Sequence, residues 1–256
     1  MHPVAFQLGR LTVTWYGILV AVGFLAGLWT ASRRAPRAGI APETVLDLGP
    51  WLIVGAILGA RAFYVISYWE ESFANEPWTE IFMIHHGGLV FYGGFIGAGL
   101  TYMVFVRWRR CPFWSLADVI APSIALGHAI GRLGCLMNGC CYGKACDLPW
   151  AIHFPLVPET GGAGVHPTQL YEAALNLGLY AALAWLFRRR PFDGVVFAGY
   201  LVAYAVLRSF VELFRGDYAS TQIVGGLTPA HWISVALFAA GLLLFWKLPR
   251  RASRQA

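Results

Sequence analysis

The chain alternates long apolar stretches with short polar connections. Seven stretches approach the ~20 mostly apolar residues that a helix needs to cross the hydrocarbon core of a bilayer. They are Thr14–Ser32, Leu46–Ser67, Gly88–Val106, Ala117–Met137, Gln169–Phe187, Gly194–Phe214 and Ala230–Trp246. The pattern predicts an all-α, polytopic integral membrane protein with seven transmembrane helices.

Composition supports the membrane interpretation. Hydrophobic residues make up 58% of the 256 residues and charged residues 12%, about half the ~25% that is usual in soluble domains. The abundance of large apolar residues excludes a disordered chain. The net charge of +6 does not predict nucleic-acid binding, because the basic residues lie in short runs between apolar stretches. No cleaved signal peptide is expected, since no cleavage site precedes a soluble domain.

The basic residues predict the orientation of the helices. Thirteen of the nineteen Lys and Arg residues fall in alternate connections and in the C-terminal tail, three fall on the opposite side and three lie inside spans. The side rich in Lys and Arg is cytoplasmic. The N-terminus is therefore expected outside and the C-terminus in the cytoplasm, as an odd number of spans requires.

One integral membrane domain, residues 1–256, is expected. Its longer outer loops cover about residues 68–87 and 138–168. Glycines recur four residues apart in four pairs, a spacing that lets helix backbones approach closely in lipid. The pairs are Gly23 and Gly27, Gly55 and Gly59, Gly93 and Gly97, and Gly127 and Gly131.

Three arginines lie inside predicted spans, where a charge costs at least ~2.5–3.5 kcal/mol. Arg208 has Glu212 one helical turn away, which predicts an internal ion pair. Arg132 has no acid three or four residues away, and His128 lies one turn before it. An arginine without an acidic partner, next to a histidine near the outer end of a span, predicts a site for an anion, most simply a lipid phosphate. Arg215, beyond the sixth span, supplies a second positive charge.

Other polar groups collect at the outer ends of the spans. Trp15-Tyr16-Gly17 opens the first span, and His166-Pro167-Thr168-Gln169-Leu170-Tyr171-Glu172 opens the fifth, with Thr168 expected as helix N-cap. This convergence favours an enzyme acting on lipid head groups. The main alternative is a transporter, in which buried charges mark a substrate pathway, but the inverted repeats typical of that class are not evident.

Six motifs in order resemble those of the prolipoprotein diacylglyceryl transferase family over nearly the whole chain. They are Trp15-Tyr16-Gly17; Gly59-Ala60-Arg61; Gly87-Gly88-Leu89 through Gly93-Gly94; Gly131-Arg132-Leu133-Gly134 through Asn138-Gly139 and Gly143; the His166–Glu172 segment; and Glu212-Leu213-Phe214-Arg215. The resemblance implies a seven-spanning enzyme of the bacterial cytoplasmic (inner) membrane. It implies transfer of the diacylglyceryl group of phosphatidylglycerol to the lipobox cysteine of a prolipoprotein signal peptide, with membrane lipid as surroundings and no cofactor, metal or nucleic acid.

The resemblance also implies roles for individual residues. Arg132 matches the signature arginine, Arg215 the second essential arginine and Tyr16 the important tyrosine of the first span. The expected substrate-binding residues are Arg132, Arg215, Arg61, Arg208, Asn138, Gly143, His166, Gln169, Tyr171, Glu172 and Glu212. Arg61 and Arg208 are expected to support the phosphate site or to brace the bundle. A drifted relative acting on another lipid or acceptor is the alternative within this interpretation.

The chain departs from the family pattern at three positions. Cys135 stands where the signature often has Asn, Cys140 where an acidic residue is typical, and Tyr92 where a histidine is often found. The usual candidate for the general base is therefore missing. His128 or Tyr92 is expected to take the proton of the thiol.

Four of the five cysteines cluster at the outer end of the fourth span: Cys135, Cys140, Cys141 and Cys146. A disulfide that staples this loop is the favoured interpretation, because the outer side permits it. Zinc is disfavoured, since the paired Cys-x-x-Cys spacing is absent. A catalytic cysteine relay rests on location alone.

Overall fold

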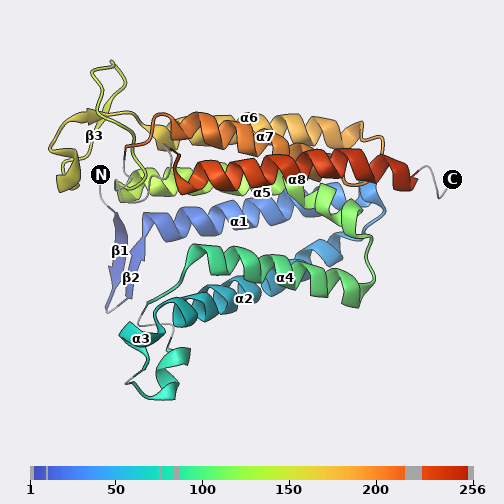
Figure 1. The fold of residues 1–256 in the computed structure, drawn as a ribbon, viewed down its shortest axis with the longest axis horizontal. Coiled ribbons are helices and arrows are strands. Elements are labelled where there is room, and N and C mark those ends of the chain that lie inside the picture. The colour runs from blue at the N-terminus through green and yellow to red at the C-terminus, as the bar shows by residue number, and fades with distance from the viewer. Residues whose placement is uncertain (1–2, 10, 75, 84–86, 217–226, 253–256) are drawn as a thin grey trace. The chain divides into compact units, whose positions relative to one another are not determined.

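The computed structural model describes residues 3–9, 11–74, 76–83, 87–216 and 227–252. The long helices are α1 (Trp15–Arg34), α2 (Pro42–Ser67), α4 (Phe91–Arg109), α5 (Phe113–Asn138), α6 (Thr168–Arg188), α7 (Val195–Glu212) and α8 (Pro229–Ala252). Figure 1 shows these helices as the dominant elements of the chain. Each predicted apolar stretch coincides with one of them.

Short elements complete the secondary structure. They are the helix α3 (Trp69–Ser72), the 3-10 turns η1 (Ala35–Ala38), η2 (Trp78–Phe82) and η4 (Pro158–Thr160), and the strands β1 (Val4–Leu8), β2 (Leu11–Thr14), β3 (Ile152–His153) and β4 (Gly164–Val165). The strands form two antiparallel pairs, β1 with β2 and β3 with β4. These small sheets were not expected from the apolar pattern, because their strands are too short to show a period.

Six helices in the described part of the chain are long and apolar enough to cross a membrane: α1, α2, α5, α6, α7 and α8. The third predicted span, α4, is helical but not among them; it contains four glycines and ends on Arg107 and Arg109. Large apolar side chains such as Leu25, Val54 and Ile66 are exposed on the outer faces of the helices. Such a surface is suited to lipid rather than water, so the chain is a multi-pass membrane protein.

Two helix boundaries differ from the predicted ones for local reasons. α2 begins at Pro42, four residues before the apolar run, because proline suits the first turn of a helix. α4 begins at Phe91 rather than at Gly88, since Gly87 and Gly88 have φ of +90° and +74°, outside the right-handed helical region.

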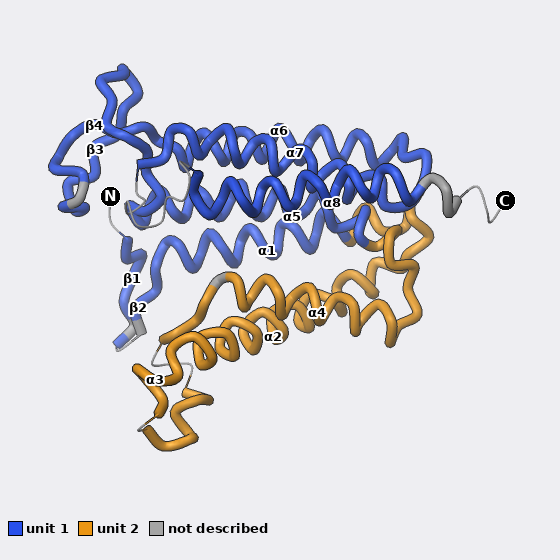
Figure 2. The backbone as a smooth tube through the Cα atoms, in the orientation of Figure 1, with its two compact units in different colours: residues 1–31, 117–256 blue, residues 32–116 orange. Residues whose placement is uncertain are grey.

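Two compact units make up the chain (Figure 2). Unit 1 contains residues 1–31 and 117–256, and unit 2 contains residues 32–116. In unit 1, α7 packs against both α6 and α8, and α1 packs against α5. In unit 2, α2 packs against α4. The expected single domain stays a prediction.

Glycine contacts confirm most of the predicted helix-packing positions. In unit 2, a Cβ on Gly59 would overlap the carbonyl oxygen of Gly93, and one on Gly97 would overlap that of Gly55. In unit 1, a Cβ on Gly23 would lie 2.9 Å from the carbonyl oxygen of Gly127. Gly131 is the exception, because a Cβ there would meet nothing within 4 Å.

A buried acid that the sequence analysis did not single out joins two helices of unit 1. Asp118 on α5 is fully buried and accepts hydrogen bonds from the backbone N–H groups of Gly194 (2.8 Å) and Phe197 (2.9 Å) at the start of α7. These are donors that a helix leaves without an internal partner. Asp118 therefore caps α7 from a neighbouring helix.

The glycine contacts predict different responses to the same substitution two residues apart. Gly97→Ala should destabilise the protein by about 1–3 kcal/mol, because the added methyl group overlaps the backbone of α2. Gly99→Ala is the matched control, since its Cβ would meet nothing within 4 Å. Thermal unfolding in detergent compares the two. Equal melting temperatures for both variants would contradict the packing described here.

Candidate active site

The predicted site residues of unit 1 meet where α5 ends, α6 begins and α7 ends. Three pieces of chain are joined there by backbone hydrogen bonds. Gly143 N–H donates to the carbonyl of His166 (2.9 Å), and Lys144 N–H donates to that of Phe214 (2.8 Å). The loop after α5 thus lies between the segments that lead into α6 and out of α7.

Gly143 has no room for a side chain in this junction. A Cβ there would lie 2.6 Å from both His166 Cβ and the carbonyl oxygen of Phe214. Gly143, which was expected to bind substrate, therefore lets the loop backbone approach the segments that contain His166 and Phe214. It also pairs with Arg215 as an isolated β-bridge, which places that arginine beside the loop.

Glu172 on α6 is the centre of the buried polar cluster. Its Oε2 lies 3.0 Å from Arg132 Nε, and its Oε1 lies 3.1 Å from His128 Nε2. Its side chain is 4% exposed. The expectation that Arg132 lacks an acidic partner is therefore wrong: the acid comes from a different helix, forty residues later in the chain, and its approach depends on the fold.

Only one edge of the Arg132 guanidinium is occupied. Nε contacts Glu172 and also donates to His128 Nε2 at 3.0 Å. Within the described part of the chain, no hydrogen bond or ion pair involves the two terminal nitrogens of Arg132. These nitrogens carry four N–H donors, and a guanidinium fork suits the oxygens of a phosphate or carboxylate.

His128 has a hydrogen-bond partner whether or not its Nε2 carries a proton. Without a proton, its Nε2 accepts from Arg132; with one, it donates to Glu172 Oε1, which is buried and otherwise lacks a hydrogen-bond partner in the described residues. A histidine that can hold a proton against a buried carboxylate, or release it, is suited to proton transfer.

The predicted pair of Arg208 and Glu212 on α7 is confirmed. Glu212 also accepts a hydrogen bond from Thr228 Oγ1 at the start of α8. Arg208 lies close enough to Glu172 for their charges to interact. Both residues are buried, so this pair braces α7 beside the Arg132 cluster.

Arg215 brings a second guanidinium near Arg132. Arg215 and Arg132 are close enough for their like charges to interact, and the charges of both arginines act on Cys141. Tyr16, which is half exposed, interacts electrostatically with Arg132 and with Cys135, Cys140 and Cys141. Two arginines and a phenol therefore surround one small region at the end of α5.

The start of α6 supports the loop rather than capping itself. Thr168 is the first helical residue and not the N-cap, contrary to expectation, because its hydroxyl donates to the carbonyl of Cys141 (2.6 Å). Gln169 Nε2 donates to the carbonyl of Cys140 (2.7 Å). The expected substrate ligand Gln169 is thus used, on its amide nitrogen, to position the cysteine loop.

His166 and Tyr171 form an aromatic group with Trp150 and Phe214. Trp150 Nε1 donates to the Tyr171 hydroxyl (2.8 Å), which lies 3.2 Å from His166 Nδ1. The His166 ring lies 5.3 Å from that of Phe214.

Asn138, the last residue of α5, lines a small hollow of about 80 Å³ with Pro3 and Phe154.

Arg61 and Tyr92 lie in unit 2. Arg61 donates to the backbone carbonyls of Glu80, Ile81 and Gly87 at 2.6–2.8 Å, and its guanidinium lies 5.4 Å from the Phe73 ring centroid. The arginine therefore holds the segment before α4 in place. Tyr92, at the start of α4, is half exposed.

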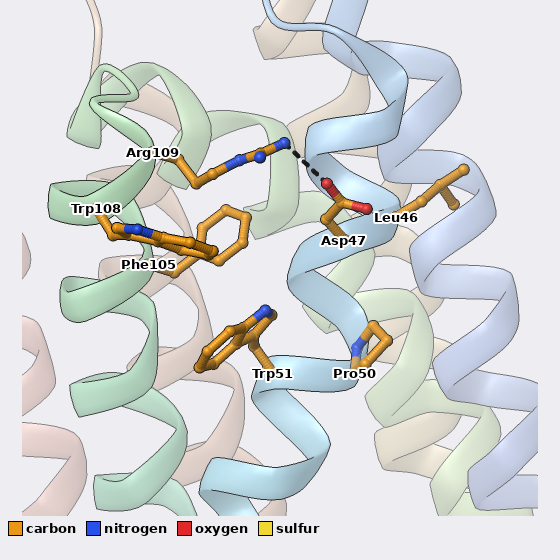
Figure 3. A pocket seen from close by; sticks show the side chains of 7 residues that line it. All are labelled: Leu46, Asp47, Pro50, Trp51, Phe105, Trp108 and Arg109. Carbon is orange, nitrogen blue, oxygen red and sulfur yellow. Dashed lines mark hydrogen bonds and ion pairs between the residues drawn. The ribbon is translucent and has the colours of Figure 1, made fainter.

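A cavity of about 360 Å³ lies between α2 and α4 in unit 2. Figure 3 shows Trp51 and Trp108 beside it and the Arg109–Asp47 ion pair (2.8 Å). None of the predicted site residues lines this cavity.

All five cysteines are free thiols. The expected disulfide of the outer loop is therefore wrong. Instead, the sulfurs of Cys135, Cys140 and Cys141 form a three-membered group.

Comparison with known proteins places the chain in a family. A profile of prolipoprotein diacylglyceryl transferase matches residues 3–247. The chain belongs to the prolipoprotein diacylglyceryl transferase family. It is 38% identical to a phosphatidylglycerol–prolipoprotein diacylglyceryl transferase of Synechococcus elongatus, over 95% of this chain and 86% of the relative.

Other relatives carry the same name. One from Gloeobacter violaceus is 38% identical over 99% of this chain and 95% of its own length, and one from Geobacillus kaustophilus is 39% identical over 98% and 93%. The family match over residues 3–247 thus spans the positions of the cluster described above. The resemblance seen in the sequence motifs is confirmed.

The buried Arg132–Glu172 pair predicts a large effect on stability. Glu172→Gln should lower the free energy of unfolding by about 3 kcal/mol or more, because it leaves a buried guanidinium without its countercharge. Asp47→Asn is the control; it breaks an ion pair whose side chains are 41% and 53% exposed, and should cost at most about 1 kcal/mol. Unfolding in detergent measures both, and a Glu172→Gln protein as stable as Asp47→Asn would contradict the assignment.

Proposed function

We propose that this protein transfers the diacylglyceryl group of phosphatidylglycerol to the lipobox cysteine of prolipoproteins, the first step of bacterial lipoprotein maturation. Family membership over residues 3–247 supports the reaction class. The observation that carries the proposal is the half-occupied guanidinium of Arg132, fixed at Nε by Glu172 with its terminal nitrogens available.

The proposed reaction forms one bond and breaks another. The cysteine sulfur attacks the glyceryl carbon that bears the phosphate, the carbon–oxygen bond breaks, and glycerol phosphate leaves with the electron pair. A thioether is formed. The leaving phosphate gains negative charge in the transition state, so cations fixed beforehand lower the barrier.

Arg132 and Arg215 are the proposed phosphate ligands. Their charges act on the same small region, and two like charges held together favour an anion between them. Arg208 and Glu212 hold α7, and Arg61 holds the segment before α4, so their proposed contribution is indirect. Tyr16 is proposed to orient the head group.

His128 is the proposed acceptor of the thiol proton. It shares Glu172 with Arg132, so a proton taken by the imidazole is stabilised by the carboxylate next to the phosphate site. Tyr92 remains the alternative that the sequence suggested. His128 is preferred because its contacts to the phosphate-binding arginine are direct.

The proposed membrane arrangement has seven spans, with α4 as the third, in the bacterial cytoplasmic membrane. Thirteen of the nineteen basic residues then face the cytoplasm. The cluster at the end of α5 lies at the outer leaflet, where a secreted prolipoprotein presents its signal peptide. The transporter interpretation has less support, because the buried arginines on α5 and α7 have acidic partners within unit 1.

Arg132→Lys should lower kcat by about 100- to 1,000-fold, the usual loss when one preorganised donor is removed from a developing anion. Lysine keeps the charge but cannot contact Glu172 and the phosphate with separate edges. Release of glycerol phosphate from phosphatidylglycerol and a lipobox peptide measures the effect. Arg33→Lys, in the basic cluster at the end of α1, is the control. Full activity of Arg132→Lys would remove the bidentate role.

His128→Gln should lower turnover while binding of phosphatidylglycerol is kept. Glutamine can both donate and accept as His128 does between Arg132 and Glu172, but it cannot take a proton. The test is kcat as a function of pH together with lipid binding by the purified variant. If turnover and its pH profile match those of the parent protein, His128 is not the base.

A further inference from the structure

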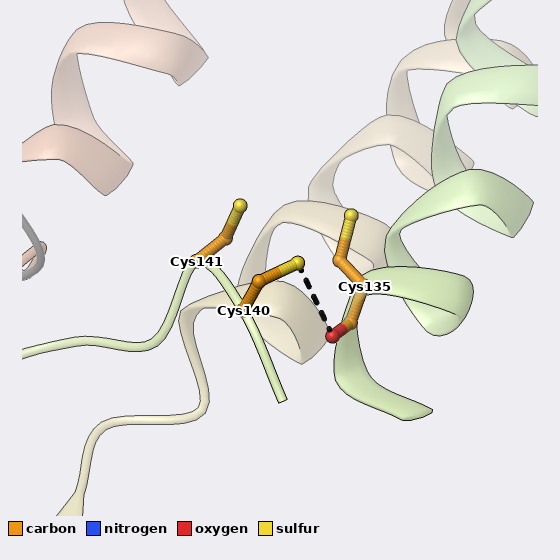
Figure 4. A group of neighbouring side chains, drawn as sticks. All are labelled: Cys135, Cys140 and Cys141. Carbon is orange, nitrogen blue, oxygen red and sulfur yellow. Dashed lines mark hydrogen bonds between the residues drawn. The ribbon is translucent and has the colours of Figure 1, made fainter. Parts of the chain in front are cut away.

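The three thiols of Cys135, Cys140 and Cys141 form a compact group. Their Sγ atoms all lie within 4.8 Å of one another, and each residue is half-buried. Figure 4 shows the three side chains side by side, with Cys140 Sγ directed toward the Cys135 carbonyl at 3.7 Å. In the described part of the chain, this is the one group of three Cys, His, Asp or Glu side chains close enough to share a metal ion.

The end of α5 builds this group through its helix cap. Gly139 has φ of +74°, its N–H donates to the Leu136 carbonyl (3.2 Å), and the Cys140 N–H donates to the Cys135 carbonyl (3.2 Å). This is the Schellman arrangement, in which the second residue after the helix contacts the third residue from its end. Cys140 is therefore folded back onto Cys135.

Cys141 joins the other two through an unusual backbone conformation. Its φ is +65°, a left-handed value that costs energy for a residue with a Cβ and is enriched at functional sites. Thr168 and Gln169, both buried, hold the Cys141 and Cys140 carbonyls by hydrogen bonds of 2.6 and 2.7 Å. The loop is thus fixed from a second helix, as ligand-bearing loops of metal sites usually are.

Two cations lie near this group. Arg215 and Arg132 are close enough to Cys141 for their charges to act on its sulfur. The thiolate is the form of cysteine that binds metals. Three thiolates and one divalent cation would carry one net negative charge, opposite in sign to the charges of the two neighbouring arginines.

We propose that Cys135, Cys140 and Cys141 bind one zinc ion whose fourth coordination position takes the thiol of the substrate cysteine. This inference rests on the proposed function for the identity of that thiol. A ligand set of three side chains and one open position is typical of catalytic rather than structural zinc.

The geometry of the group suits zinc. Tetrahedral coordination with Zn–S bonds of about 2.3 Å places the sulfurs about 3.8 Å apart, so a spread of up to 4.8 Å requires movements of about 1 Å. The sequence spacing did not reveal these three ligands, because Cys135 lies within α5 whereas Cys140 and Cys141 follow the helix cap. A disulfide between two of these cysteines would leave the third without a partner.

Zinc would activate the substrate thiol in a chain that lacks the acidic residue and the histidine usual in the family. The substrate thiol would bind the metal and lose its proton to His128 or to water. The thiolate would then attack the glyceryl carbon, and glycerol phosphate would leave toward Arg132 and Arg215. The product sulfur is a thioether, a much weaker ligand than a thiolate, so it leaves the metal; no oxidant or reductant is needed.

Metal analysis tests the site itself. Protein purified without chelator should contain an equimolar amount of zinc, and Co²⁺ added to the metal-free protein should give thiolate charge-transfer bands and the visible spectrum of tetrahedral cobalt. Cys135→Ser, Cys140→Ser and Cys141→Ser should each weaken zinc binding by more than about 100-fold, since loss of an outer-shell partner alone costs about 10- to 100-fold. Cys146→Ser and Cys111→Ser, outside the group, should bind zinc as the parent does.

A measurement on the unaltered chain covers the case in which the serine variants fail to fold. Zinc should raise the melting temperature of the metal-free parent protein, and Mg²⁺ should not. If the parent protein neither retains zinc nor gives a cobalt–thiolate spectrum under reducing conditions, the metal site does not exist.

A lipobox peptide tests the open coordination position. Adding the peptide to the Co²⁺ protein should shift the spectrum as a fourth thiolate binds, and a peptide with serine in place of cysteine should not. Removal of zinc should abolish glycerol phosphate release, and zinc should restore it. Full activity of the zinc-free protein would overturn this inference and leave the transferase proposal intact; zinc-loaded protein without any transferase activity would overturn the proposed function.

Discussion

The carboxylate of Glu172 is the interaction on which the rest of the site depends. It is buried on α6 and contacts Arg132 Nε and His128 Nε2, both on α5, at 3.0 and 3.1 Å. A guanidinium at this depth would be very unfavourable alone. Because the acid binds one edge only, it stabilises the charge of Arg132, sets the direction of the side chain and leaves the remaining donors for an anion.

The backbone around this pair is arranged to keep the donors in place. Gly143 lies against His166 and Phe214, and Lys144 bonds to both segments, so the loop after α5 is attached to the start of α6 and the end of α7. The same loop carries Cys140 and Cys141, and Arg215 lies next to it. The loop therefore brings two of the thiols close to Arg215, one of the two proposed phosphate ligands.

Much of the fold follows from the sequence, and the site follows in part. Apolar stretches predict the long helices because a lipid-facing helix needs an apolar surface along its whole length, and Arg208 finds Glu212 because both lie on one helix. The Arg132–Glu172 pair is not predictable in this way, since it depends on how α5 and α6 pack. The thiol group had a local signal in Asn138-Gly139, which predicts a helix cap that returns Cys140 to Cys135. The left-handed Cys141 had none.

The central claim is that the terminal nitrogens of Arg132, together with Arg215, hold the phosphate of the lipid. A structure of the protein with bound phosphatidylglycerol in a lipid nanodisc tests it most directly. The account predicts phosphate oxygens within hydrogen-bond distance of both guanidinium groups while Glu172 still contacts Arg132 Nε. A head group bound elsewhere, with Arg132 enclosed by protein on all its edges, would contradict it.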